Sequence, residues 1–311
     1  MTATGSAAPP VPAAAPARVA IPFLVCTLIW GSTWFVIGSQ LHYVPAAWCI
    51  AYRFALAALA MIALARASGV SLAIGRAGHG LALLIGVPQF TLNYIFVYSA
   101  EEQIASGLVA LVSALLIVPN ALFGRLLLGH KVTRRFLIGS GIAMAGIALL
   151  FADQVARGPV ADAHRTLLGV VLSLGGVVAA SSANVLQGTR RAATIPAVSL
   201  IAWAMLYGSV CNIAYAMVAA GPPVFSRDPL FLAGLLYLSV AGSAVTFTLY
   251  FAVIRAIGPA RAGYIGVLIP VIAMALSTLF EGYRWTAGAA AGAALAIGGL
   301  LVAMRGRSPA R

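Results

Sequence analysis

The sequence predicts an all-α integral membrane protein of ten transmembrane helices, arranged as two inverted five-helix repeats. Three observations indicate this fold class: the scarcity of charged residues, the lengths of the apolar segments, and an internal repeat at a fixed offset. Of the 311 residues, 62% are hydrophobic and only 8% are charged, whereas soluble domains carry about 25% charged residues. So few charges cannot cover a surface that faces water, and most of the chain is therefore expected to face lipid.

Apolar segments of the length that a membrane requires follow one another along the chain. A transmembrane helix needs about 20 mostly apolar residues, and charges, prolines and glycines divide the sequence into ten such segments. The predicted helices cover residues 19–38, 46–65, 79–98, 104–124, 136–152, 167–187, 197–219, 230–254, 260–280 and 285–304. The Ala/Pro-rich residues 1–18 are predicted to form a disordered tail, and residues 305–311 a second short tail. All connections are brief, so no separate soluble domain is expected.

The distribution of charge predicts how these helices are oriented. Fourteen of the 19 basic residues fall at one set of helix ends, and all six acidic residues fall at the other. The basic set is Arg18, Arg66, Arg76, Arg125, Lys131, Arg134, Arg135, Arg190, Arg191, Arg255, Arg261, Arg305, Arg307 and Arg311. By the positive-inside rule this side is cytoplasmic, and so are both ends of the chain.

The same charge pattern bears on partners and on source. The basic residues form short groups between apolar runs and not one exposed face, so nucleic acid is not an expected partner. The expected partner is the lipid bilayer of a cell inner (plasma) membrane. A single lysine against eighteen arginines, together with abundant alanine, is typical of a GC-rich bacterial genome.

An internal repeat relates the two halves of the chain, residues 19–152 and 167–304. A shift of 151 residues superimposes prolines and glycines that would rarely coincide by chance. These pairs are Pro45 with Pro196, Pro119 with Pro270, and Gly141 with Gly292. Each half holds five helices, an odd number, so the second half enters the membrane from the opposite side. Inverted repeats are typical of transporters, because mirror-related halves can open a shared site to either side in turn; an old duplication without mechanical role is the alternative.

Several motifs add a family resemblance to this reading. The first predicted helix contains WGSTW at residues 30–34, and the second contains Arg53 within VPAAWCIAYRFALAALA. The fourth ends in LLLGHKVT, and IGPARAGYIGVLIPV leads to Glu281 in the second half. With these motifs, residues 20–304 resemble the EamA-like family of the drug/metabolite transporter superfamily. The resemblance implies a ten-helix carrier of small metabolites, commonly directed outward, with a central cavity between its repeats; His130 stands where that family usually has a glutamate.

Arg53 is the one charge that the helix map places well inside a span. A charge at that depth costs at least a few kcal/mol unless it is paired or wetted, which makes it a functional candidate. Two interpretations remain open: Arg53 binds a substrate carboxylate, or it is a structural strut that bonds to neighbouring groups. Glu281, near the outer end of the ninth helix, is a weak candidate for ion coupling, with a solvated interfacial charge as the alternative.

Polar and aromatic residues that share helical faces complete the candidate substrate site. They are Trp30, Thr33 and Trp34; Gln89, Asn93 and Tyr94; Ser181 and Asn184; Ser243, Thr246 and Tyr250; and Tyr264. Because such groups would lack partners in lipid, we expect them to face a cavity or another helix. Aromatic walls with few charges favour a small, neutral or zwitterionic, partly apolar substrate such as an amino acid. Contacts between helices are the alternative role for these residues.

Other functional classes find less support in the sequence. No GxxxxGK[ST] motif is present, which argues against a nucleotide-driven pump. A membrane-embedded enzyme would need catalytic groups at one depth, and a channel would need a ring of charges or a filter loop; both remain as alternatives without a motif. The three cysteines are scattered in apolar segments, so no metal or cofactor is expected. Glycine pairs at 141 and 146 and at 288 and 292 predict close helix contacts, within the chain or in a homodimer.

Overall fold

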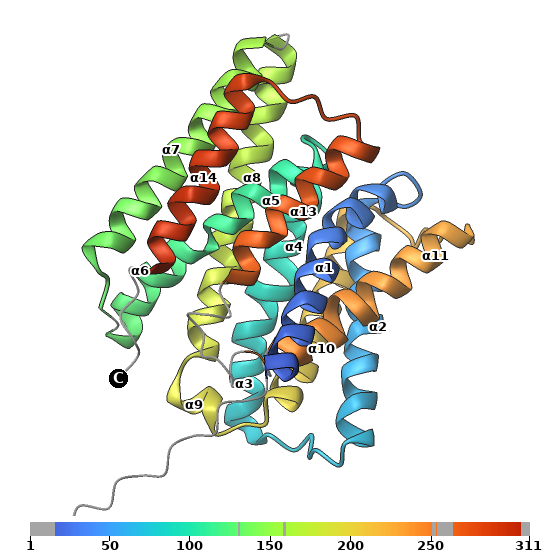
Figure 1. Cartoon of the computed structure of the whole chain (residues 1–311). Coiled ribbons are helices and arrows are strands. Elements are labelled where there is room, and N and C mark those ends of the chain that lie inside the picture. Colours follow the sequence, from blue (N-terminus) through green and yellow to red (C-terminus); the bar gives the residue numbers. More distant parts are fainter. Residues whose placement is uncertain (1–15, 130, 158–159, 251–252, 254–263, 306–311) are drawn as a thin grey trace, which may run out of the picture.

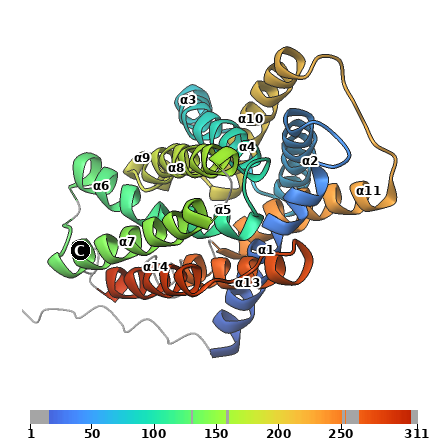
Figure 2. The same cartoon turned by 90° about the horizontal axis from the view of Figure 1, so that it is seen from above.

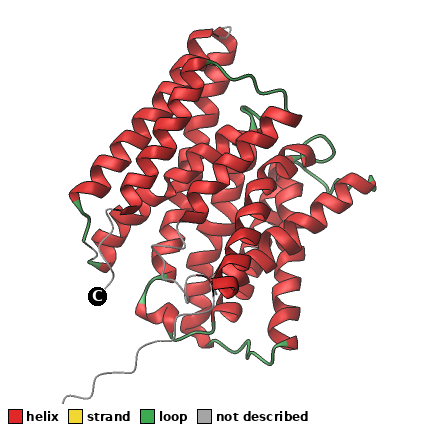
Figure 3. Ribbon diagram, viewed as in Figure 1, coloured by secondary structure: helices red, strands yellow, loops and turns green. Residues whose placement is uncertain are grey.

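The computed structural model describes residues 16–129, 131–157, 160–250, 253 and 264–305. Every regular element in these ranges is a helix, and the helices form one elongated bundle (Figures 1 and 2). Figure 3 shows the same arrangement by secondary structure. Eight helical segments are long and apolar enough to cross a membrane, and two shorter apolar helices, Ile265–Phe280 and Ala287–Ala303, complete the set. The predicted all-α fold with ten membrane helices is confirmed.

The first half of the chain contains five spans, two of which are composite. Their elements are α1 (Pro16–Gln40), α2 (Ala46–Ala67), α3 (Gly75–Gly86) with the π-helix η1 (Val87–Leu92) and α4 (Asn93–Glu101), α5 (Ser106–Ser113) with the 3₁₀-helix η2 (Ala114–Leu116) and α6 (Ile117–Leu128), and α7 (Arg134–Arg157). The α-helical pattern changes at η2, which contains Leu115. The carbonyl group of Leu115 cannot accept the α-helical hydrogen bond from Pro119, because proline lacks the backbone N–H.

The second half repeats this order. Its elements are α8 (Val160–Gln187), the short α9 (Arg190–Ala193), α10 (Ala197–Ala219), α11 (Pro229–Leu236) with the π-helix η3 (Tyr237–Val245), α13 (Tyr264–Phe280) and α14 (Ala287–Arg305). Two helices pack against the helix that the 151-residue shift makes equivalent to them: α2 against α10, and α7 against α14. A helix that contacts its equivalent in the other repeat lies beside the pseudo-twofold axis that relates the two halves.

Several helix ends differ from the sequence-based prediction. The predicted fifth helix, 136–152, is in fact the 24-residue α7, and α8 begins at Val160 and not at residue 167. A charge ends the apolar segment but not the helix, because a helix can extend beyond the hydrocarbon layer into water. For the same reason α1 begins at Pro16, inside the predicted tail of residues 1–18. Residues 1–15 and 306–311 of the two predicted tails lie outside the described part of the chain.

The connections between helices gather at two ends of the bundle. Those joining α1 to α2, α4 to α5 and α13 to α14 lie in the upper part of Figure 1, where α7 ends and α8 begins, and the one joining α2 to α3 lies at the bottom. We call the top the acidic end, and it carries Glu101, Glu102, Asp153, Asp162 and Glu281. These five of the six acidic residues thus lie at one end of the bundle, as the sequence map requires. That the acidic end faces the outside of the cell stays a prediction.

Glycines bring α7 and α14 into backbone contact, and the two helices lie side by side in Figures 1 and 2. A Cβ atom on Gly146 would lie 2.6 Å from the carbonyl oxygen of Gly292, and a Cβ on Gly299 would lie 2.6 Å from that of Gly139. Small residues at such contacts let helices approach closely. The glycine-rich faces therefore meet within one chain. A homodimer through these helices stays an untested prediction.

The two π-helices occupy equivalent places in the two halves. Residues 87–92 of η1 shifted by 151 become 238–243, which lie within η3. Side chains from other spans bond to their carbonyl groups: Asn212 Nδ2 donates to Phe90 O at 2.9 Å, and Trp30 Nε1 donates to Gly242 O at 3.2 Å. π-Helices are rare and occur frequently at functional sites. These two flank the centre of the bundle, where Arg53 lies.

Candidate substrate site around Arg53

Arg53 lies inside the bundle, about 11 Å along α2 from its first residue at 1.5 Å per residue. The side chain is only 1% exposed, and neighbouring α2 residues such as Phe54 and Ala57 are fully buried. The helix continues regularly through this position because alanine and other good helix formers surround it. Arg53 is thus a charge buried inside the helix bundle, and its depth in the membrane stays a prediction.

Two tyrosines hold the guanidinium group of Arg53. Nη1 donates to the hydroxyl of Tyr98 and Nη2 to that of Tyr94, each at 3.4 Å. The guanidinium carbon also lies 4.6 Å from the ring centroid of Tyr94 and 5.4 Å from that of Phe54, within cation–π range. Both hydrogen bonds are long for a charged donor. Arg53 Nε is buried and has no hydrogen-bond partner among the described residues.

The opposite side of the Arg53 group is formed by α1 and η3. Thr33 is buried and donates to Trp30 O at 2.8 Å, which leaves its methyl group to face η3. A Cβ atom on Gly242 would lie 2.9 Å from Thr33 Cγ2 and 3.8 Å from Arg53 Nη2. Glycine at 242 therefore lets the backbone of the eighth span approach Arg53. Four spans from both halves of the chain meet at this point.

Aromatic rings extend this group along the bundle. The indole of Trp30 makes edge contacts with Phe247 at 5.5 Å and with Tyr250 at 5.1 Å between ring centroids. Trp34 is half-buried and packs against the main core. Thr33, Arg53 and Tyr94 of the predicted set thus lie close together. Trp30 bonds to Gly242 beside them, and Tyr250 contacts the indole of Trp30. This arrangement offers a cation surrounded by aromatic and small apolar surfaces.

Other predicted residues bond elsewhere. Asn184 on α8 donates to Asn120 Oδ1 of α6 at 3.5 Å, a contact between helices. Ser181 is fully buried and Gln89 is 8% exposed, and the Ser181 hydroxyl and Gln89 Oε1 have no partner among the described residues. Asn93 is half-buried, and its Oδ1 would lie 3.2 Å from a Cβ atom on Gly176. Asn93 therefore lies at the contact of the third span with α8.

The hydroxyls of the eighth span turn back on their own helix. Ser243 Oγ donates to Leu238 O at 2.9 Å and Thr246 Oγ1 donates to Ala241 O at 2.7 Å, and both side chains are fully buried. Each bonds to the residue five positions earlier, where the wider π-helix leaves room for a side chain to reach the carbonyl group. The side chain of Tyr264 lies outside the described part, as do His130 and residues 257–263 of the second-half motif.

Glu281 lies at the acidic end and not beside Arg53. Its Oε2 accepts hydrogen bonds from the backbone N–H of Ser106 at 3.1 Å and from Ser277 Oγ at 2.7 Å.

Among the described residues, no group of three or more His, Cys, Asp or Glu side chains is placed to hold a metal ion.

Sequence reasoning missed three members of the Arg53 group. Tyr98 follows Tyr94 by four residues on the same face of α4, so the i, i+4 rule could have found it. Phe54 is adjacent to Arg53 in sequence but is indistinguishable from any other apolar residue. Gly242 carries no local signal, because its role depends on a contact between segments nearly 190 residues apart.

The comparison with known proteins agrees with this fold. The model of the EamA-like transporter family matches residues 18–152 and 167–305. A solved crystal structure superimposes with a TM-score of 0.67 over 93% of this chain and 97% of that chain, at 19% sequence identity, which shows a shared fold.

Curated relatives point the same way. A "probable amino-acid metabolite efflux pump" of Salmonella typhimurium is 23% identical over 90% of this chain and 92% of its own length. The uncharacterized inner membrane transporter YedA of Escherichia coli K12 is 30% identical over 81% of this chain and 79% of its own length. Protein PecM of Dickeya dadantii is 24% identical over 81% of this chain and 80% of its own length. With both halves matched, this multi-pass membrane protein belongs to the EamA-like transporter family.

Proposed function

We propose that the protein is a secondary carrier that exports small amphiphilic metabolites such as amino acids. In this proposal the two halves open a shared site alternately to either side, and Arg53 binds the carboxylate group of the substrate. The observation that carries the proposal is the state of Arg53: a buried cation with a partnerless Nε and two long bonds to neutral hydroxyls. A substrate carboxylate could bind the guanidinium in the bidentate geometry that arginine favours.

The surroundings of Arg53 support a substrate with an apolar part. Trp30, Tyr94 and Phe54 offer aromatic surfaces, and the two hydrogen bonds of Arg53 to Tyr94 and Tyr98 use neutral partners. A zwitterion with a small apolar side chain fits such a mixture of one cation and aromatic walls. The relative from Salmonella typhimurium that is named a probable amino-acid metabolite efflux pump supports both the substrate class and the outward direction.

The test measures exchange of radiolabelled L-leucine and L-threonine across proteoliposomes that contain the full chain. Arg53→Lys keeps the positive charge but loses the planar guanidinium group, and Arg53→Ala loses both. We expect each variant to raise the half-saturating concentration by about 10- to 100-fold, since a hydrogen bond to a charged group is worth about 1.5–3 kcal/mol. Arg66→Ala is the matched control, because Arg66 lies on the same helix with an exposed side chain; it should transport normally.

A second measurement asks whether the carboxylate is recognised. Leucinamide, which lacks the carboxylate, should compete at least about tenfold more weakly than leucine in the unsubstituted protein. Equal competition by leucine and leucinamide, or normal affinity in Arg53→Lys, would show that Arg53 does not bind the substrate and acts as a strut.

A further inference from the structure

At the acidic end, side chains of the second half cap a helix of the first half. Glu281 Oε2, just beyond α13, accepts from the backbone N–H of Ser106 at 3.1 Å, and Ser277 Oγ accepts from the N–H of Gly107 at 2.8 Å. Ser277 also donates its hydroxyl proton to Glu281 at 2.7 Å. The first two N–H groups of α5 are thereby bonded by residues from α13 and its C-terminal end. These bonds join the two halves where the acidic end closes.

A second carboxyl group belongs to the same network. Glu101 Oε2, at the end of α4, accepts from the hydroxyl of Ser106 at 2.9 Å, while its Oε1 is buried without a partner among the described residues. A Cβ atom on Gly38 of α1 would lie 3.3 Å from Glu101 Oε2 and 3.5 Å from Glu281 Oε1. Glycine at position 38 leaves room for both carboxyl groups, which border the same point between the halves.

The two carboxyl groups differ in what stabilises them. Glu281 accepts two hydrogen bonds and stands at the N-terminus of α5, where the helix dipole favours a negative charge. Glu101 accepts from the Ser106 hydroxyl, and its other oxygen is buried and bonded to nothing described. Both carboxyl groups accept a hydrogen bond from Ser106, so two negative charges there would repel each other. A single proton held by the pair would remove this repulsion. Within the pair, the partnerless oxygen of Glu101 is the place for that proton.

The arginines of α2 and α8 differ in their relation to the pair. Arg53 from α2 acts on Glu101 at a distance, with Tyr98 between them on α4. Arg165 from α8 is directed instead to Glu102 O at 2.9 Å and to the side chain of Gln103. Gly38 of α1 contributes its backbone, and α5 and α13 contribute the serines already described. Asp153, Asp162 and Arg284 line the cavity beside the network.

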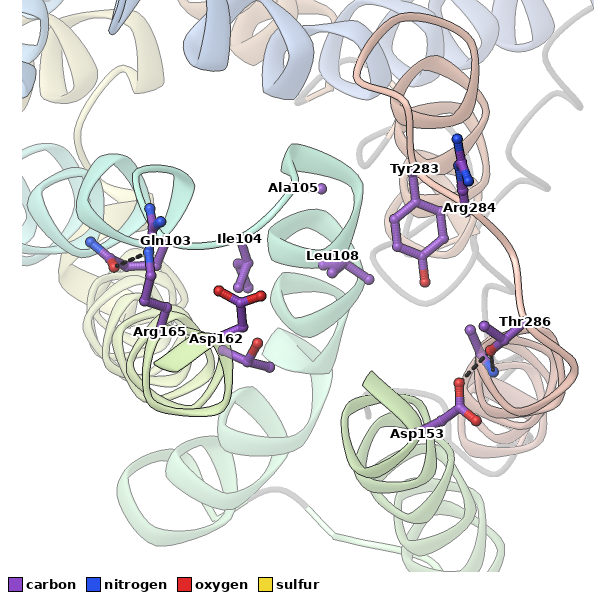
Figure 4. A pocket seen from close by; sticks show the side chains of 12 residues that line it. Gln103, Ile104, Ala105, Leu108, Asp153, Asp162, Arg165, Tyr283, Arg284 and Thr286 are labelled. Atoms are coloured by element: carbon purple, nitrogen blue, oxygen red, sulfur yellow. Dashed lines mark hydrogen bonds between the residues drawn. The ribbon is translucent and has the colours of Figure 1, made fainter. Parts of the chain in front are cut away.

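A cavity lies beside this network at the acidic end. A cavity of about 660 Å³ opens there between the α4–α5 turn, the start of α8 and the α13–α14 connection (Figure 4). Its lining includes Ala105, directly before Ser106, and Tyr283, two residues after Glu281. Glu281 is exposed, whereas Oε1 of Glu101 is not. The exposed carboxyl group of Glu281 is therefore the member of the pair that solvent can reach directly.

We propose that Glu101 and Glu281 form a proton-controlled latch that holds the acidic end of the carrier closed. With the proton on Glu101, the pair carries one negative charge, and the caps between α5 and α13 persist. When the proton leaves to the water of the cavity, two carboxylates face each other, and their repulsion separates the halves at this end. The latch thus closes at low pH and opens at high pH. The proposal rests on the alternating-access function proposed above.

The first test detects the proton directly in the full chain reconstituted in lipid. The infrared C=O stretching band of a protonated carboxyl group should be present at about pH 5 and lost by about pH 9. Glu101→Gln should remove this pH-dependent band. Glu102→Gln is the matched control: it changes the adjacent glutamate, whose pKa is raised by burial but which lies outside the network, and the band assigned to Glu101 should remain. A band that survives in Glu101→Gln would overturn the proposal.

The second test measures opening with a membrane-impermeant maleimide. Leu108 lines the cavity yet is only 2% exposed, so Leu108→Cys should react when the latch opens. Relative to the exposed Arg284→Cys, its labelling should be roughly tenfold faster at about pH 9 than at about pH 5. Adding Glu101→Gln should make labelling slow at both pH values, and adding Glu281→Gln, which removes the charged cap, should make it fast at both.

Ser106→Ala gives an independent variant should Glu101→Gln fold poorly, because it removes the bridging hydroxyl and keeps both carboxyl groups. We expect it to weaken the pH dependence of labelling. Unchanged pH dependence in both Glu101→Gln and Ser106→Ala would refute the latch. Neither test requires a transported substrate, so a failure of the proposed transport activity would remain distinguishable from a failure of the latch.

Discussion

Replacing Gly146 by alanine should push α7 away from α14 and destabilise the protein. The new Cβ atom would lie 2.6 Å from the carbonyl oxygen of Gly292 and 2.8 Å from Cβ of Leu295. Contacts of this length require one helix to move by several tenths of an ångström, because the obstacle is backbone and cannot rotate away. The whole α7–α14 contact would have to adjust, since Gly139 and Gly299 meet backbone in the same way.

The magnitude follows from two opposing terms. Overpacking a close contact costs typically about 1–3 kcal/mol, whereas alanine is better than glycine in a helix by about 1 kcal/mol. The net loss for Gly146→Ala is therefore about 1 kcal/mol. Gly141→Ala separates the two terms, because Gly141 lies on the same helix, is exposed, and has nothing within 4 Å of its would-be Cβ atom. Gly141→Ala should therefore show only the stabilisation that comes from the higher helix propensity of alanine.

The assay is equilibrium unfolding in mixed micelles, with the denaturing detergent fraction increased and tryptophan fluorescence recorded. Gly141→Ala should be as stable as the unsubstituted chain or more stable. The difference between the two variants should be about 1–3 kcal/mol, because the helix term cancels between them. If Gly146→Ala proved as stable as Gly141→Ala, the backbone contact between α7 and α14 would not exist as described.

Three further predictions use the same preparations. Trp30→Phe keeps an aromatic ring but loses the hydrogen bond to Gly242 O, and should cost about 0.6 kcal/mol in the same unfolding assay; no loss would mean that the bond does not form in the membrane. Asn212→Leu leaves Phe90 O of η1 without its partner and should destabilise by a similar amount, with Asn212→Gln as the variant that could restore the bond. Reporter fusions in the α2–α3 connection should read as cytoplasmic and those in the α10–α11 connection as external; the reverse pattern would invert the predicted orientation.

The number of helices could be predicted because the membrane imposes a length on each apolar segment, and length is visible in sequence. The ends of α7 and α8 could not, since Asp153 and Asp162 end the apolar segments while the helices continue in water. The π-helical interruptions within the spans were only partly predictable. η1 contains Pro88, a visible signal, whereas η3 has no proline at the equivalent place.

Some features of the candidate site could likewise be predicted from the sequence, and others could not. Arg53 was predictable because a charge within an apolar span is conspicuous, and its tyrosine partners lie on one face of a helix. The bonding of Ser243 was not, because its hydroxyl meets a carbonyl group that only a π-helix makes reachable. The approach of Gly242 to Arg53 joins opposite halves of the chain. Contacts of this kind depend on tertiary structure and leave no pattern in the local sequence.

The matched π-helices carry information about the history of the chain. A π-helix holds one residue more than an α-helix with the same hydrogen-bonded frame, since its bonds run from i to i+5. The offset of 151 nonetheless holds both before the π-helices, at Pro45 and Pro196, and after them, at Gly141 and Gly292. The two halves therefore keep equal length across their π-helices, as duplication of one five-helix unit that already contained the irregularity would leave them. In that history, an irregular third helix came before the fusion of the two halves.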